Sequence, residues 1–407
     1  MPLAPLSRRA FAGAGLAAIA VSDAAAEPLH DVTYIEDFDE LWRTLGERYC
    51  FFAEKATDWG SVRRLYRPMA LAAASTAAFT EVVRRVLAEL YDAHTHLSDP
   101  PDGTPRWPPF DLLADPGAGG VRIAAIEEGS AAADAGLVVG DEVVSIGGEP
   151  VAAAIAALTP RCLTRRDPAA VRYAANVAIA GRRGQGRDLG LRTADGAVRR
   201  VQVPLKPRPP APDVESRSLE GGLGYIRIRG FADDATVAAF DAALAKLANP
   251  RGLVLDVRDN GGGDTAVARP IMGRFIAERR PYALMRRRAG AALSAPWTEY
   301  VEPRGPSTFR GPVVVLADHW SASMAEGFAM GMRDIGRARI VGTRMIGLGA
   351  AVFPIRLDRT DVAAQYSGEA VYDTKGAPRS SLRPDVDAGT GDILAAGEAE
   401  LRRQLAG

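Results

Sequence analysis

The sequence predicts an α/β protein in which buried strands alternate with helices over the C-terminal half of the chain. Short apolar runs, most of them rich in β-branched residues, lie at 223–228, 253–257 and 313–317. Each run precedes a segment with helical periodicity, at 233–247, 265–276 and 323–332. Strands that alternate with helices favour a largely parallel sheet covered by helices.

The composition limits the classes of function. A chain of 407 residues is long for one core, so two or three domains are expected. Basic and acidic residues both number 50, which gives no reason to expect nucleic acid or an anionic membrane as a partner. We expect no cofactor. Cys50 and Cys162 are expected to be separate buried thiols, although an exported protein could join them.

Residues 1–26 have the pattern of an export signal. Arg8 and Arg9 precede an apolar run that is too short to span a bilayer, and small residues follow it. The paired arginines before Phe11 resemble a twin-arginine signal, so a periplasmic or extracellular location is expected. An ordinary secretion signal and an uncleaved anchor remain alternatives. No later segment is long and apolar enough to cross a membrane.

Residues 27–105 are predicted to form a helical region. Apolar residues recur at helical spacing in 36–50, 62–71 and 79–91. A proline-rich stretch at 100–109 marks its end.

Residues 106–205 resemble a PDZ domain, because the run from Gly129 to Gly148 indicates a short helix, a turn and a strand closed by a Gly-Gly hairpin. The resemblance implies that the C-terminus of a peptide adds as an extra strand. The expected carboxylate loop is 117–121, the expected groove helix is 152–158, and the alternative is a domain that only packs against its neighbour. The residues expected to bind the peptide are Gly120, Val121, Arg122 and Ile123.

A second proline-rich linker, at 204–212, separates this domain from a core at 206–407. Two strand-to-helix turns in the core carry small residues. The first follows the strand at 253–257 and contains Gly261, Gly262 and Gly263; the second contains Ser321 and Ser323. A serine at a helix N-terminus supplies a nucleophile, and free backbone N–H groups beside it supply oxyanion donors. Acyl transfer requires at least these two components.

Residues ~34 to 390 are similar, in order, to the C-terminal processing proteases and the tricorn protease core. The matching motifs are Asp92 to Thr95, the PDZ run, Asp256 to Gly263, and Ser321 to Glu326. The resemblance implies a spiral α/β core of the type shared with crotonases and ClpP, with an inserted PDZ domain. It implies a serine peptidase, closer to the histidine-dependent, tricorn-like branch.

The resemblance assigns Ser323 as the nucleophile, and the backbone N–H groups of Gly262 and Met324 as the oxyanion hole. A helix N-terminus also favours a developing negative charge at that place. The alternative is that Ser321 or Ser323 only caps the helix, a role that Ser321 could fill while leaving Ser323 free.

The base that activates the serine cannot be the lysine of the processing proteases, because Leu348 stands at that position. Arg344 cannot deprotonate, and only Lys375 could reach in from elsewhere. His94 matches the tricorn-like pattern and is the expected base. His319 is the alternative base, and a metal site with His94 and His96 is a rival that lacks a third ligand.

The resemblance implies an acidic third member of the catalytic triad, several residues before a Pro-Asp pair. The pair here is Pro384 and Asp385, and the matching position is occupied by Pro378, which is not an acid. Glu369 is the expected replacement and Asp373 the alternative.

We therefore expect an exported serine endopeptidase that cleaves peptides or unfolded protein tails, some of them held in the PDZ groove. The alternative is a catalytically inactive binding or scaffold protein of the same fold. An acyl-CoA enzyme of the crotonase type follows from the fold alone, and export to a compartment without CoA and the PDZ domain argue against it.

Overall fold

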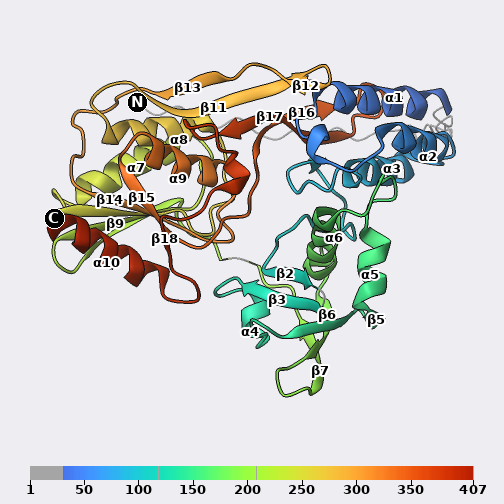
Figure 1. Ribbon diagram of the computed structural model, residues 1–407, viewed down its shortest axis with the longest axis horizontal. Helices are drawn as coiled ribbons and strands as arrows, with labels where there is room; N and C mark the ends of the chain where they lie inside the picture. Colours follow the sequence, from blue (N-terminus) through green and yellow to red (C-terminus); the bar gives the residue numbers. More distant parts are fainter. Residues whose placement is uncertain (1–30, 118, 208, 407) are drawn as a thin grey trace, which may run out of the picture.

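The computed structural model describes residues 31–117, 119–207 and 209–406. The predicted signal at 1–26 and His30 lie outside this part. The described chain forms an α/β core, a helical region at the far end of a second sheet, and a PDZ domain (Figure 1). Within the described residues, no helix has both the length and the apolar character needed to cross a membrane.

The core sheet has the strand order β18-β15-β14-β10-β9-β8. All neighbours pair in parallel except β8, which is antiparallel to β9. Its strands are β8 (Val214–Leu219), β9 (Leu223–Ile228), β10 (Gly252–Asp256), β14 (Val313–Ala317), β15 (Ala338–Gly342) and β18 (Val386–Asp387). The predicted α/β core with its largely parallel sheet is confirmed.

Two layers of helices cover this sheet. Alternate residues of a strand face opposite sides, so Val313 and Val315 pack in one hydrophobic cluster while Val314 and Leu316 pack in another. The first layer is α7 (Asp234–Lys246), α8 (Thr265–Met272) and α9 (Met324–Asp334), and the second is α10 (Ile393–Ala406). Figure 1 shows α10 on the side of the sheet away from α8 and α9.

A second sheet extends from the core to the helical region. Its strands are β1 (His96–Leu97), β11 (Arg280–Ala289), β12 (Ala292–Leu293), β13 (Trp297–Val301), β16 (Ala350–Arg356) and β17 (Ala363–Tyr372). The helices at its far end are α1 (Asp31–Arg48), α2 (Trp59–Leu71) and α3 (Thr76–Ala88). Ile355 and Tyr366 of this sheet are buried in the same hydrophobic cluster as the three helices. The helical region therefore shares its core with strands from near the C-terminus.

The PDZ domain is a third sheet with the order β2-β3-β4-β6-β7, and β5 pairs with β4. Its strands are β2 (Leu112–Gly117), β3 (Gly120–Ile126), β4 (Glu142–Ile146), β5 (Glu149–Pro150), β6 (Arg187–Arg192) and β7 (Val198–Val203). Its helices are α4 (Ala131–Asp134), α5 (Val151–Leu158) and α6 (Pro168–Ala180). Helix α6 packs along β2, whereas α5 packs against α6 and β4.

One ion pair is buried in the PDZ domain. Both oxygens of the Asp111 carboxylate accept hydrogen bonds from the Arg187 guanidinium, at 2.6 and 2.5 Å, and both side chains are only 4% exposed. Such a pair is costly to break, because the remaining charge stays buried without its partner.

We therefore expect Asp111→Asn to lower the free energy of unfolding by about 3–5 kcal/mol. Asp115→Asn is the control, because the Asp115–Arg172 pair is long, at 3.8 Å, and exposed, at 66% and 58%. Urea denaturation of the two variants measures the difference. Equal effects would show that the buried pair contributes no more than the exposed one.

Candidate active site

Ser323 lies at a strained turn between β14 and α9. Its backbone angles are φ 53° and ψ −115°, a conformation that residues with a Cβ rarely adopt. Strain of this kind persists only where the surrounding structure imposes it, and it concentrates at functional sites. Ser321, by contrast, is fully buried, and its hydroxyl donates to the Val257 carbonyl at 2.8 Å. Ser323 rather than Ser321 occupies the N-cap position of α9, so Ser321 does not take the capping role that the sequence left open to it.

Gly262 lies directly against this turn. A Cβ at Gly262 would come within 2.7 Å of the Ser323 Cβ and 2.8 Å of the Met324 nitrogen, so only glycine fits. The N–H of Gly262 donates to the Asn260 side chain at 2.7 Å. Met324 is the first residue of α9, and its N–H is among the donors that lack an acceptor within the helix. The structure thus brings the two predicted oxyanion donors to Ser323, with the Gly262 donor engaged by Asn260.

Glu326 connects the turn to the next loop. Its carboxylate is fully buried and accepts the N–H groups of Ser323, Gly347 and Leu348, at 2.9, 2.7 and 2.9 Å. Burial raises the pKa of this carboxyl to about 7, while Arg379 and the three backbone donors act in the opposite direction. In the sequence Glu326 is recognisable only as the last residue of a motif, and no local pattern indicates that it holds the loop.

His94 lies in the buried turn between α3 and β1. Its backbone N–H donates to Asp92, and its carbonyl accepts from the Gln365 side chain. The ring Nδ1 is buried without a hydrogen-bond partner among the described residues. Burial lowers the pKa of His94 to about 4; the Asp92 carboxylate opposes this effect and the Arg379 guanidinium adds to it.

Arg379 is a buried cation that the sequence analysis did not assign. Its guanidinium donates to the carbonyls of Leu348 and Ala350, each at 2.8 Å. It also lies beside α9, because a Cβ on Gly327 would come within 3.4 Å of it. Arg379 stands one residue after Pro378, the position at which the resemblance placed an acid, and its positive charge acts on His94.

The structure does not bring Glu369 to His94. Antiparallel pairing of β11 with β17 sets Glu369 opposite Arg287, and the two side chains approach to 3.8 Å. Burial raises the pKa of Glu369, and the charges that act on it are Arg287 and Glu299. The structure therefore does not support the expected role of Glu369 in orienting His94. Asp373 is no substitute, since its carboxylate accepts the N–H groups of Lys375 and Ala377 in its own turn.

The other two described histidines have contacts of their own, and the candidate lysine lies at the surface. The His96 ring stacks on Trp107 at 3.9 Å, and its two nitrogens contact the Leu97 carbonyl and Gln365. His319 packs edge-on against Trp320, and Lys375 is exposed in a turn. No group of three or more possible metal ligands occurs in the described residues. Cys50 and Cys162 are free and buried, as expected.

The predicted peptide site in the PDZ domain is wrong. Strand β3, which contains Gly120, Val121, Arg122 and Ile123, pairs with β2 on one side and with β4 on the other. An inner strand has no free edge to which a peptide could add. The helix that was expected to line the groove, at 152–158, is α5, and it packs against α6 and β4.

The strained serine, the glycine beside it and the helix N-terminus define a nucleophile turn of the serine-hydrolase type on an α/β core. Family comparisons agree with this class. Residues 222–388 match the peptidase family S41, residues 31–88 the tricorn protease C1 domain, and residues 122–158 the PDZ domain. The core of the chain thus matches peptidase family S41, and the chain is similar to C-terminal processing proteases.

Individual relatives are distant. The chain is 25% identical to the carboxy-terminal processing protease CtpB of Bacillus subtilis over 68% of this chain and 54% of that protein. It is 26% identical to the chloroplastic C-terminal processing peptidase of Tetradesmus obliquus over 86% and 76% of the two chains. The match thus spans only about half of the Bacillus protein.

Solved structures share the fold. The photosystem II D1 C-terminal processing protease superposes with a TM-score of 0.57 at 21% identity, over 87% of this chain and 93% of that one. Mature CPAF superposes with a TM-score of 0.60 at 16% identity, over 92% and 96%.

The raised pKa of Glu326 makes the stability of the core depend on pH. In the folded protein Glu326 keeps its proton up to about pH 7, whereas the ordinary pKa of a glutamate side chain is 4.5. Between pH 4.5 and pH 7 the folded state therefore binds more protons than the unfolded state. The free energy of unfolding should therefore fall by roughly 3 kcal/mol as pH rises through this window.

Glu326→Gln should remove this part of the pH dependence, because the amide does not titrate. Glu278 is exposed, so Glu278→Gln is the control and should keep the pH dependence of the wild type. Denaturation midpoints from pH 4.5 to 8 measure the slope. Parallel slopes in the wild type and Glu326→Gln would contradict the assignment.

Proposed function

We propose that the chain is a serine peptidase that acts on peptides or unfolded protein tails through an acyl-enzyme on Ser323. The observation that carries the proposal is the strained Ser323 turn with Gly262 against it. The Ser323 oxygen attacks the substrate carbonyl carbon, and the oxyanion accepts the Met324 N–H at the start of α9. The amine leaves with a proton, and water then releases the acyl group.

The base in this proposal is His94. Its low pKa keeps the imidazole neutral, which is the form that accepts the serine proton. Its ring lies close to the Ala350 carbonyl and within the field of Arg379, which itself lies beside α9. Among the described residues no hydrogen bond joins His94 to Ser323, so substrate binding has to bring the two together. Catalytic hydrogen bonds often tighten only in the complex.

The second candidate is a binding protein of the same fold without catalysis. Two observations favour it: the unpartnered His94 Nδ1, and a buried arginine where an acid would stabilise imidazolium. A serine and histidine without the acid retain only part of the activity of a full triad.

We also propose that the protein is exported, by the twin-arginine route, on the strength of Arg8, Arg9 and the apolar run after them. Fractionation of cells that express the wild type and an Arg8→Lys/Arg9→Lys variant tests the route. Retention of the variant in the cytoplasm is the expected result, and unchanged export would contradict it.

A fluorophosphonate probe should label the wild type, because the activated serine oxygen displaces fluoride from phosphorus. Ser323→Ala should abolish labelling, and His94→Ala should slow it by roughly 10²–10⁴-fold through loss of the base. His319→Ala is the matched control and should label normally. Gel fluorescence against time gives the rates. Equal labelling of the wild type and Ser323→Ala would remove Ser323 from the mechanism, and an unlabelled, folded wild type would favour the binding protein.

The acylation rate should rise with a midpoint near the His94 pKa of about 4 and stay level from about pH 5.5 to 8. Arg379→Gln should move this midpoint upward, because removal of the neighbouring cation favours imidazolium. The exposed Arg383→Gln should leave it unchanged. Single-turnover acylation between pH 3.5 and 8 tests this expectation. A midpoint that does not respond to Arg379→Gln would show that another group titrates.

A further inference from the structure

The PDZ domain has one strand edge beside a helix at which an extended peptide could add. Strand β2 lies at the edge of the sheet and pairs only with β3, so its other side is open to strand addition. Helix α6 packs along this open side. The free edge thus lies between a strand and a helix, as a peptide groove requires.

Asn176 of α6 already occupies this edge. Its side-chain oxygen accepts the Ala114 N–H at 2.8 Å, and its side-chain nitrogen donates to the Ala114 carbonyl at 2.9 Å. A third hydrogen bond joins Asn176 to the Arg172 carbonyl at 2.9 Å. The amide therefore satisfies both backbone groups that Ala114 would offer to a peptide strand. Asn176 is only 5% exposed and Ala114 only 1%.

Beyond Ala114, toward the C-terminal end of β2, the edge offers little to a second strand. Successive residues of a strand alternate in direction, so the next backbone after Ala114 that faces outward is that of Pro116. Proline has no N–H to donate. Leu112 and Ala114 are therefore the outward-facing donors of β2, and Asn176 occupies the one nearer the C-terminal end of the strand. A peptide could add along β2 only after these two hydrogen bonds are released.

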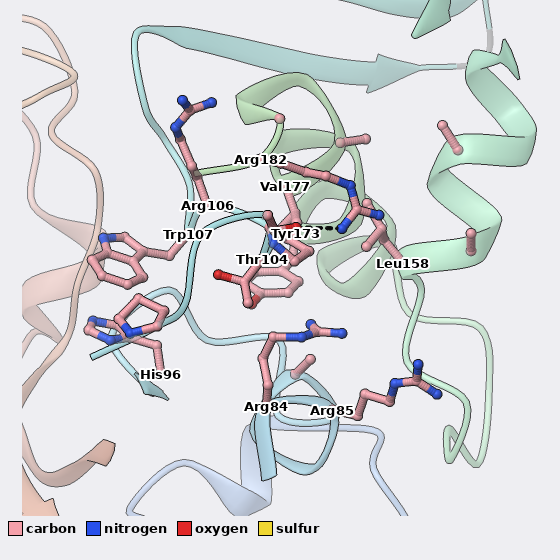
Figure 2. A pocket seen from close by; sticks show the side chains of 18 of the residues that line it. Arg84, Arg85, His96, Thr104, Arg106, Trp107, Leu158, Tyr173, Val177 and Arg182 are labelled. Atoms are coloured by element: carbon pink, nitrogen blue, oxygen red, sulfur yellow. Dashed lines mark hydrogen bonds between the residues drawn. The ribbon is translucent and has the colours of Figure 1, made fainter. Parts of the chain in front are cut away.

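Space for such a release lies on another face of α6. A cavity of about 1160 Å³ separates the PDZ domain from α3, and Tyr173 and Val177 of α6 line it together with Leu158 and Arg84 (Figure 2). Asn176 is not among the residues that line the cavity. A shift of α6 away from β2 could therefore be accommodated by this space.

We propose that Asn176 is a latch that keeps the PDZ domain closed to C-terminal tails, and that a tail binds when α6 leaves β2 and moves toward the cavity. The inference rests on the proposed action on protein tails, but its test needs no catalysis. The tail supplies backbone groups for Ala114 in place of the Asn176 amide, so the exchange conserves hydrogen bonds at the edge.

The test uses the full chain with Ser323→Ala, which separates binding from cleavage. The probe is a fluorescein-labelled decapeptide with an apolar C-terminal residue and a free carboxylate, and fluorescence anisotropy gives its affinity. Asn176→Ala and the milder Asn176→Ser should each bind it roughly ten-fold more tightly than the chain that keeps Asn176, because two competing hydrogen bonds are gone. Asn249→Ser, at an exposed loop position, should have no effect.

Hydrogen exchange of residues 110–117 gives a second readout that does not depend on the peptide. Exchange of the Ala114 amide should be faster in Asn176→Ser than in Asn249→Ser if the latch protects it. Tighter peptide binding and faster exchange in the latch variants support the proposal. Equal affinity with and without Asn176, no binding by any variant, or unchanged exchange would each overturn it.

Discussion

The buried Glu326 carboxylate holds the Ser323 turn and the loop at 347–348 together. A carboxylate can stay in a protein interior only when nearly all of its acceptor capacity is used, and here three backbone N–H groups use it. One of these groups belongs to Ser323 and two to the loop at 347–348. Because backbone atoms make these contacts, the loop keeps its place whatever side chain stands at position 348. Leucine can therefore replace the family lysine without collapse of the loop.

Much of the fold was predictable because its signals are local. The alternation in Val313 to Leu316 and the small residues after each strand reflect period-two burial and tight turns, which depend only on near neighbours. The strained conformation at Ser323 was not predicted, because the sequence indicated only a small-residue turn and a helix at 323–332. The position of His94 at the end of the helical region followed from the family motif.

Contacts between distant segments were not predictable. Glu369 faces Arg287 because β17 pairs with β11, and no pattern within β17 encodes its neighbour. Residues 120–123 have the apolar alternation of a peptide-binding strand, yet strand order makes β3 an inner strand. Arg379 has no sequence signal of burial, because an arginine next to a proline is usually exposed. Its partners come from a loop that the chain passes thirty residues earlier.

The shared core of the helical region has a consequence for synthesis. The Gln365 side chain bonds to the His94 carbonyl across 271 residues, and strands β16 and β17 close the cluster around α1, α2 and α3. At typical elongation rates these strands emerge roughly 15–55 seconds after the helices. During this interval the apolar faces of the helices lack part of their cover. The nascent chain therefore offers a hydrophobic surface to chaperones until nearly the whole protein has left the ribosome, and truncation before residue 363 should leave that surface exposed permanently.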